Sequence, residues 1–452
     1  MAVEILESCF VAPGEVTPKH GLWLSNLDFM AARRYTPMVF FYRPSHRPAS
    51  SPYVLKAALS KALVPFYPLA GRFAPDSTGR LEISCTGDGV LFVTARADAT
   101  LDDMVDLAPS DELRRMLVPS AEGGDHAGVL AMFQVTFFRC GVVCLGTALH
   151  HTAADGRAFA NFLNTWAAIA RGVSEAAISR PCLDRPLLRA RSPPAVRFDH
   201  AMNCCSGRGS SKPKVPFDTA ILPVSRNQAE MLKGGAGAGA QGKKVTTFNA
   251  VADHVWQCAC KARGLAGTQD TRLYMTADAR SRVRPPLPDG YLGNAVVRAL
   301  AVAKVHDIVS GALAAAADRV SDATARLSDE YIRSLVDYME QATSNVAGLR
   351  IAEWPAIPET DLWITSWLGL PFSNVDFGWG RPAFIGRATI KHSGQVKLVS
   401  SPDGDGGLDV VVAMEPQSLA RFKELFYEGL KRYSLVSQIN VSDTHVVRRS
   451  KI

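Results

Sequence analysis

Residues 142–172, "VVCLGTALHHTAADGRAFANFLNTWAAIARG", pass from one periodic pattern to another. Up to residue 151 apolar residues predominate, which is typical of a buried strand. From residue 155 apolar residues recur at helical spacing, and Gly172 suits the end of a helix. Together with the apolar stretch 129–138 and a tight turn after it, this segment predicts two adjacent strands followed by a helix.

Strand and helix patterns alternate along the whole chain, so the predicted class is α/β with mixed sheets and helices. The 452 residues exceed what one core usually holds. From 181 to 215 Pro, Arg and Ser dominate and the periodicity is lost, which is typical of a connection. We therefore expect an N-terminal domain over 1–180, a crossover over 181–215 and a C-terminal domain over 216–452. A helix is expected in the stretch 53–73, where Pro65 and Pro68 end it. Further helices are expected over 246–265, 307–327 and 418–432, and a hairpin over 395–414.

The composition is that of an ordinary globular protein, with 47% apolar and 21% charged residues. The net charge of +7 is spread along the chain, which disfavours a nucleic-acid partner and mildly favours an anionic ligand. No apolar stretch approaches the length of a membrane span. The nine cysteines are an odd number without a CxxC pair, so we expect a cytoplasmic protein with reduced cysteines.

The two adjacent histidines are the chemically unusual feature of this stretch. In an extended strand His150 and His151 point to opposite faces, so they do not readily chelate one metal, and we expect no metal site. Asp155 lies at the turn into the helix, where its carboxylate can bond back across the turn and hold the backbone that presents His151. An imidazole suits general-base chemistry near neutral pH. The alternatives are a pair of core histidines bonded to backbone and a nucleophilic triad, although no GxSxG motif occurs.

A second motif, "DFGWG", occupies residues 376–380. Its two glycines flank Trp379 and predict a tight, unusual backbone, which Asp376 is placed to anchor through an arginine. The DFG letters of protein kinases come with an HRD loop and a glycine-rich strand, and neither is present in this sequence.

With these motifs the sequence resembles the plant BAHD acyltransferase family over nearly its whole length. The resemblance rests on "HHTAADG" with His151 and Asp155, on "DFGWG", on "YPLAGR" at 67–72 and on "DARSRVRPPLPDGYLGN" at 278–294. It implies a two-domain chloramphenicol-acetyltransferase-like fold with a channel between the domains. His151 would be the catalytic base. Asp155 would point away from the substrate in a salt bridge, and Asp376, catalytic in some descriptions, would have a structural role in a pair with Arg280. Gly156, Gly378 and Trp379 would support the site.

The same resemblance implies direct transfer from acyl-CoA to an acceptor in a ternary complex, without an acyl-enzyme. Thr365, Trp367 and Gly369 would belong to the oxyanion and acceptor pocket. Lys243, Lys244, Thr246 and Thr247 would contact CoA, although a capped surface helix with solvated lysines explains these four equally well. Acyl-CoA is a co-substrate, so no cofactor is expected, and we expect a monomer.

The blocks 7–29 and 365–380 resemble the hydroxycinnamoyl-CoA branch, whose members acylate shikimate, quinate or amines such as putrescine and agmatine. The shikimate enzymes carry an arginine for the acceptor carboxylate where this chain has Gly369. Loss of a bidentate carboxylate partner favours an amine acceptor. O-acylation of shikimate or quinate remains an alternative, as does a non-catalytic acyl-CoA-binding protein.

Overall fold

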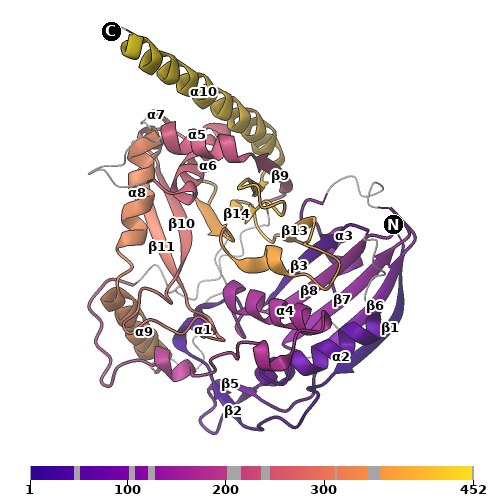
Figure 1. Cartoon of the computed structure of the whole chain (residues 1–452). Helices are drawn as coiled ribbons and strands as arrows, with labels where there is room; N and C mark the ends of the chain where they lie inside the picture. The colour runs from indigo at the N-terminus through magenta and orange to yellow at the C-terminus, as the bar shows by residue number, and fades with distance from the viewer. Residues whose placement is uncertain are drawn as a thin grey trace.

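Two six-stranded sheets, one built mainly from each half of the chain, form the framework of the molecule (Figure 1). The structure is a computed structural model and describes residues 2–44, 51–100, 107–120, 128–200, 215–235, 245–310, 313–344 and 357–449. The predicted α/β class with mixed sheets is confirmed.

The first sheet has the strand order β1-β6-β7-β8-β3-β13. Its neighbouring strands are antiparallel except β6 and β7, which are parallel. The edge strand β13 comes from the C-terminal half and directly follows the second motif, so that motif is tied to the sheet that carries the first. The strands are β1 (Val3–Val11), β3 (Tyr35–Tyr42), β6 (Val90–Ala97), β7 (Ala131–Phe138), β8 (Val143–His150) and β13 (Phe384–Arg387).

The two strands and the helix predicted over 129–172 form as β7, β8 and α4 (Gly156–Ala170). Side chains of β8 alternate between two cores, as a strand covered on both faces requires. Leu145 and Leu149 join the core that includes α4, whereas Cys144 and Ala148 join the core that includes α3 (Asp111–Leu117). The apolar face of α4 also packs against α2 (Pro52–Ala62). This packing fixes the end of β8, where the histidine pair lies.

The second sheet has the order β11-β10-β12-β14-β15-β9, with parallel pairs only at β10–β12 and β12–β14. The hairpin predicted over 395–414 is confirmed as β14 and β15. Helices α5, α6, α8 and α10 pack together beside this sheet (Figure 1). The elements are β9 (Asp218–Val224), β10 (Asp270–Asp278), β11 (Val296–Lys304), β12 (Leu362–Ser366), β14 (Gln395–Ser400), β15 (Leu408–Met414), α5 (Arg226–Gly235), α6 (Thr247–Ala262), α8 (Leu313–Ala325) and α10 (Pro416–Arg449).

The remaining elements are short. A three-stranded sheet has the order β2-β5-β4. The elements are β2 (Gly21–Trp23), β4 (Arg72–Pro75), β5 (Leu81–Ser84), α1 (Asn26–Met30), α7 (Val305–Ser310), α9 (Asp329–Ser344) and the 3-10 turns η1 (Tyr67–Ala70), η2 (Glu175–Ala177), η3 (Arg185–Leu188) and η6 (Pro371–Asn374).

Proline residues lie at the boundaries of two predicted helices. In the stretch 53–73 the helix ends before Pro65 as predicted, since α2 stops at Ala62 and η1 follows. The last helix begins at Pro416 and not at Ser418, since proline fits the first helical position. Residues 201–214 of the expected crossover lie outside the described residues. None of the helices within the described ranges combines the length and apolarity needed to cross a membrane.

Candidate active site

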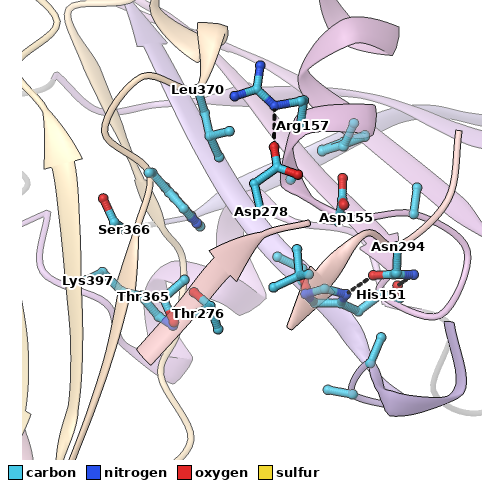
Figure 2. A pocket seen from close by; sticks show the side chains of 18 of the residues that line it. His151, Asp155, Arg157, Thr276, Asp278, Asn294, Thr365, Ser366, Leu370 and Lys397 are labelled. Atoms are coloured by element: carbon cyan, nitrogen blue, oxygen red, sulfur yellow. Dashed lines mark hydrogen bonds and ion pairs between the residues drawn. The ribbon is translucent and has the colours of Figure 1, made fainter. Parts of the chain in front are cut away.

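A cavity of about 230 Å³ lies between the two halves of the molecule (Figure 2). The first half contributes His151 and Asp155 from the β8–α4 turn, together with residues of β3. The second half contributes Thr276 and Asp278 of β10, residues 365–367 at the end of β12, and Lys397 of β14. His151 and Asp155 of the first motif therefore share the cavity with residues more than 100 positions away in the sequence.

His151 is the first residue after β8, and its backbone N–H donates to the carbonyl of Arg34 over 3.0 Å. Its Nδ1 lies 3.2 Å from Oδ1 of Asn294. Burial lowers the pKa of His151 below its ordinary value, so the ring is neutral at neutral pH. A neutral imidazole lining a cavity is in the correct form to accept a proton.

His150 points the opposite way, as the strand alternation predicted. Its ring packs edge-on against Tyr35 and Phe73, with centroid separations of 5.3 and 4.8 Å. Burial lowers the pKa of His150 to about 4. His150 does not line the cavity, so His151 alone of the pair reaches it.

Asp155 is 1% exposed and is engaged on both oxygens. Arg280 donates to it from both terminal nitrogens, over 2.8 and 3.0 Å. The backbone N–H groups of Ala158 and Ala295 donate as well, over 3.0 and 2.9 Å, and the first of these caps α4. Burial raises the pKa of Asp155, but Arg280 and the backbone N–H groups of Ala295 and Ala158 together outweigh burial and leave the pKa below its ordinary value. A carboxylate held in this way organises the turn and is a poor proton acceptor.

The pair expected between Asp376 and Arg280 does not form, because Arg280 is engaged by Asp155 and Asp278. Asp376 instead folds its own turn: one carboxylate oxygen accepts the N–H groups of Gly378 and Gly380 over 2.7 and 2.9 Å. Both glycines have positive φ, at 94° and 89°, which other residues rarely adopt.

The second motif therefore stabilises its own turn and packs that turn against β3. Its Trp379 packs edge-on against Tyr42 of β3, with ring centroids 4.9 Å apart. Asp376 is not among the residues that line the cavity. A structural role for Asp376 stays a prediction, and the contacts of its carboxylate lie within its own turn and not with Arg280.

Asp278 joins the two halves beside the cavity. It accepts from Nε of Arg157 at the start of α4 over 2.9 Å and from Arg280 over 3.3 Å (Figure 2). Gly156 lies where the halves approach closely, since a Cβ atom there would come within 3.1 Å of Cδ1 of Leu370.

Thr365 lies across the cavity from His151 (Figure 2). Its hydroxyl oxygen accepts from Nζ of Lys397 over 2.8 Å and from Nε1 of Trp363 over 3.2 Å. A hydroxyl has two acceptor sites and one proton, so with both acceptor sites used the proton of Thr365 is left to donate elsewhere. Burial lowers the pKa of Lys397 well below its ordinary value, and Arg387 and Arg34 lower it further.

The other predicted pocket and CoA residues fall into three groups. Trp367 lines the cavity, whereas Gly369 is part of the following turn, with φ of 77°, and does not. Thr246 caps α6 by accepting from the N–H of Asn249 over 3.1 Å, and neither it nor Thr247 lines the cavity. Lys243 and Lys244 lie outside the described residues.

Among the cavity residues that the sequence reasoning missed, three carry polar groups close to the chemistry: Asn294, Arg387 and Lys397. A signal was available for two of them. Asn294 ends the stretch 278–294 that carried the family resemblance, and Lys397 is a cation in the otherwise apolar alternation of a predicted strand. Arg387 and Lys397 both line the cavity, so the cavity contains a guanidinium although position 369 carries none.

The molecule thus has two packed halves, a cavity between them and the imidazole of His151 at the cavity wall. The model of the Transferase family matches residues 1–429. The chain therefore belongs to this family, the BAHD acyltransferases that the motifs indicated, and it is an acyltransferase.

The chain is 64% identical to putrescine hydroxycinnamoyltransferase 1 of Oryza sativa subsp. japonica, covering 95% of this chain and 100% of that one. It is 40% identical to shikimate O-hydroxycinnamoyltransferase of Nicotiana tabacum, with the same coverage of each chain. Its structure is similar to that of vinorine synthase, with a TM-score of 0.71, 24% identity, and coverage of 93% of this chain and 96% of that chain.

Proposed function

We propose that this enzyme transfers a hydroxycinnamoyl group from CoA to the amino group of a small amine such as putrescine or agmatine. The observation that carries the chemistry is the neutral imidazole of His151 at the cavity wall, with no carboxylate among the described residues bonded to its ring. The amine acceptor is supported by the 64% identity to a putrescine hydroxycinnamoyltransferase.

The mechanism follows from the groups around the cavity. The nitrogen of the acceptor attacks the thioester carbonyl, and His151 takes the proton that the nitrogen releases. The hydroxyl of Thr365 is available to donate to the oxyanion. As the C–S bond breaks, the imidazolium returns its proton to the CoA thiolate. General-base action of this kind contributes roughly 10²–10⁴-fold to the rate.

A second candidate, O-acylation of a carboxylate-bearing alcohol such as shikimate or quinate, is favoured by one observation. The guanidinium of Arg387 lines the cavity and is a natural partner for a carboxylate. Burial lowers the pKa of Arg387 to about 9, which means that an anion beside it would be bound favourably. The 40% identity to a shikimate enzyme supports this candidate more weakly.

Three further properties belong to the proposal. Acyl-CoA is a co-substrate, and the mechanism requires no separate cofactor. The enzyme works in the reducing cytosol, supported by the free state of its seven described cysteines. It acts as a monomer, since one chain supplies the groups that the mechanism uses.

The deciding experiment measures CoA release from p-coumaroyl-CoA with putrescine, agmatine, shikimate and quinate at several pH values. An amine attacks only in its neutral form, so with putrescine the rate at subsaturating acceptor should keep rising above pH 8. With an alcohol it should level off once His151 is neutral. A kcat/KM higher for shikimate or quinate than for both amines would reject the amine proposal and support the second candidate.

A further inference from the structure

Asn294 joins the imidazole of His151 to the N-terminal helix α1. It is 1% exposed, and its backbone N–H donates to Oδ1 of Asp28 over 2.7 Å. Its side-chain nitrogen faces three acceptors: Oδ1 of Asp28 at 3.0 Å, the carbonyl of His151 at 2.9 Å and the carbonyl of Thr152 at 3.3 Å.

These contacts settle which way the amide of Asn294 is turned. Each of the three groups accepts hydrogen bonds and none donates, so the atom that faces them must be the amide nitrogen. The reverse orientation would place an oxygen against three oxygens in a buried site, at a high cost in free energy. The amide oxygen is therefore the atom directed at Nδ1 of His151.

The orientation of Asn294 in turn decides where the proton of His151 lies. An amide oxygen only accepts, so the 3.2 Å contact is a hydrogen bond only when Nδ1 carries the proton. In the neutral ring Nε2 is then unprotonated. The carbonyl of His151 is a further hydrogen-bond partner of its own ring and is also an acceptor, so it adds no competing donor.

We propose that Asn294 is a positioning residue that holds neutral His151 in the tautomer with its proton on Nδ1, so that Nε2 is the nitrogen that accepts the proton of the acceptor. This inference rests on the proposed role of His151 as the base. It assigns Asn294 a task in catalysis that a purely structural amide would not have.

Asp28 holds Asn294 by accepting hydrogen bonds from its backbone and side-chain nitrogens, and other buried groups hold Asp28 in turn. Both Asp28 and Arg185 are 0% exposed and form an ion pair over 3.0 Å. The backbone N–H and the hydroxyl of Ser25 also donate to Asp28, each over 2.8 Å. Ser25 and Asp28, the carbonyls of residues 151–152, Arg185 and Asn294 therefore converge behind the imidazole, and the amide cannot turn without breaking several buried hydrogen bonds.

The charged groups around His151 act on its pKa from other directions. Asp155, on the same turn, raises it, and Arg387 of β13 lowers it. His150 is the preceding residue on β8, and Asp28 lies beyond Asn294. None of these contributes a described hydrogen bond to the imidazole of His151, so among the described residues the side chain that selects the tautomer is Asn294.

The direct test is the nitrogen NMR spectrum of the full-length enzyme labelled with ¹⁵N-histidine, recorded without substrate at pH 8. The signals of His151 are assigned by their loss in His151→Gln. We expect a protonated Nδ1 and an unprotonated Nε2. A proton on Nε2, or averaged signals from both tautomers, would overturn the proposal. Because no acceptor is added, the result is independent of which substrate the enzyme uses.

Asn294→Ala provides the second measurement, with Asn26→Ala as the matched control. Asn26 is also 1% exposed and bonded through its amide, to the carbonyl of Val336, but it does not touch His151. Asn294→Ala leaves the carbonyl of His151 as the remaining acceptor for the ring, so the tautomer protonated on Nε2 should appear beside the parent tautomer and kcat should fall roughly tenfold, about the value of one hydrogen bond. The KM for p-coumaroyl-CoA should not change.

The control Asn26→Ala distinguishes the loss of tautomer control from the loss of a buried, hydrogen-bonded amide. Asn26→Ala should keep the parent tautomer and the parent kcat per folded molecule. A parent tautomer with parent kcat in Asn294→Ala would refute the positioning role, even if acyl transfer itself is fully established. If Asn294→Ala does not fold, the spectrum of the parent enzyme alone decides.

Discussion

The buried pair between Asp155 and Arg280 leads to a quantitative prediction about stability. Asp155→Ala removes the partner of a guanidinium that is 6% exposed, and it also removes the acceptor for two backbone N–H groups. Leaving one member of a buried pair without its partner costs about 3–5 kcal/mol. We therefore expect Asp155→Ala to lower the free energy of unfolding of its part of the molecule by about that amount.

Asp278→Ala is the matched control, because Asp278 binds the same guanidinium with a side chain that is 36% exposed. Water screens such a pair, so its loss should cost about 1 kcal/mol or less. Urea unfolding of both variants, followed by circular dichroism at neutral pH, provides the comparison. Equal destabilisation by the two variants, or a change below 1 kcal/mol in Asp155→Ala, would refute the assignment of Asp155 as the buried anchor.

The depressed pKa of Asp155 determines how the destabilisation by Asp155→Ala depends on pH. In the unfolded chain an aspartate titrates near about 3.9. Its stabilising contribution is therefore fully present above that value and is lost only as the pH falls through the lower pKa of the folded state. The difference in free energy of unfolding between the parent and Asp155→Ala should stay constant from about pH 5 to 8 and decrease only in stronger acid.

Three other predictions concern the cavity and the second motif. Because burial depresses the pKa of His151, the kcat/KM profile, once divided by the fraction of the acceptor amine that is neutral, should have the midpoint of its acid limb below pH 6.5; a midpoint above 7 would contradict this. Lys397→Met removes one of the two donors to the hydroxyl of Thr365, and kcat should fall roughly tenfold at an unchanged fold, as measured by CoA release; an unchanged kcat would show that this hydroxyl does not need Lys397. Asp376→Ala should lower the free energy of unfolding by about 1–3 kcal/mol while the activity per folded molecule stays near that of the parent, and a selective loss of activity would instead indicate a catalytic role.

The local part of the site could be predicted from the sequence. The alternation of a strand separates His150 from His151, and a carboxylate at a helix start explains why Asp155 caps α4. Both inferences depend on residues within one strand, one turn and one helix. They needed no knowledge of what packs against that segment.

The partners across the site could not be predicted in the same way. Arg280 was assigned to Asp376 on the family resemblance, and the sequence itself does not show which acid an arginine can reach. Lys397 meets Thr365 because β14 pairs in parallel with β12, and this places the two residues opposite one another. Sheet order and register determine such contacts, and the sequence of one strand does not specify its neighbour.

The most direct test of the account is whether CoA release depends on His151 without an acyl-enzyme. Parent enzyme and His151→Gln are compared with p-coumaroyl-CoA and putrescine, and each is also incubated with p-coumaroyl-CoA alone for intact-mass analysis. We predict a fall in kcat of roughly 10²–10⁴-fold in the variant and no acylated protein in either sample. A parent rate in His151→Gln, or an acylated protein that transfers its acyl group to putrescine, would contradict direct general-base catalysis.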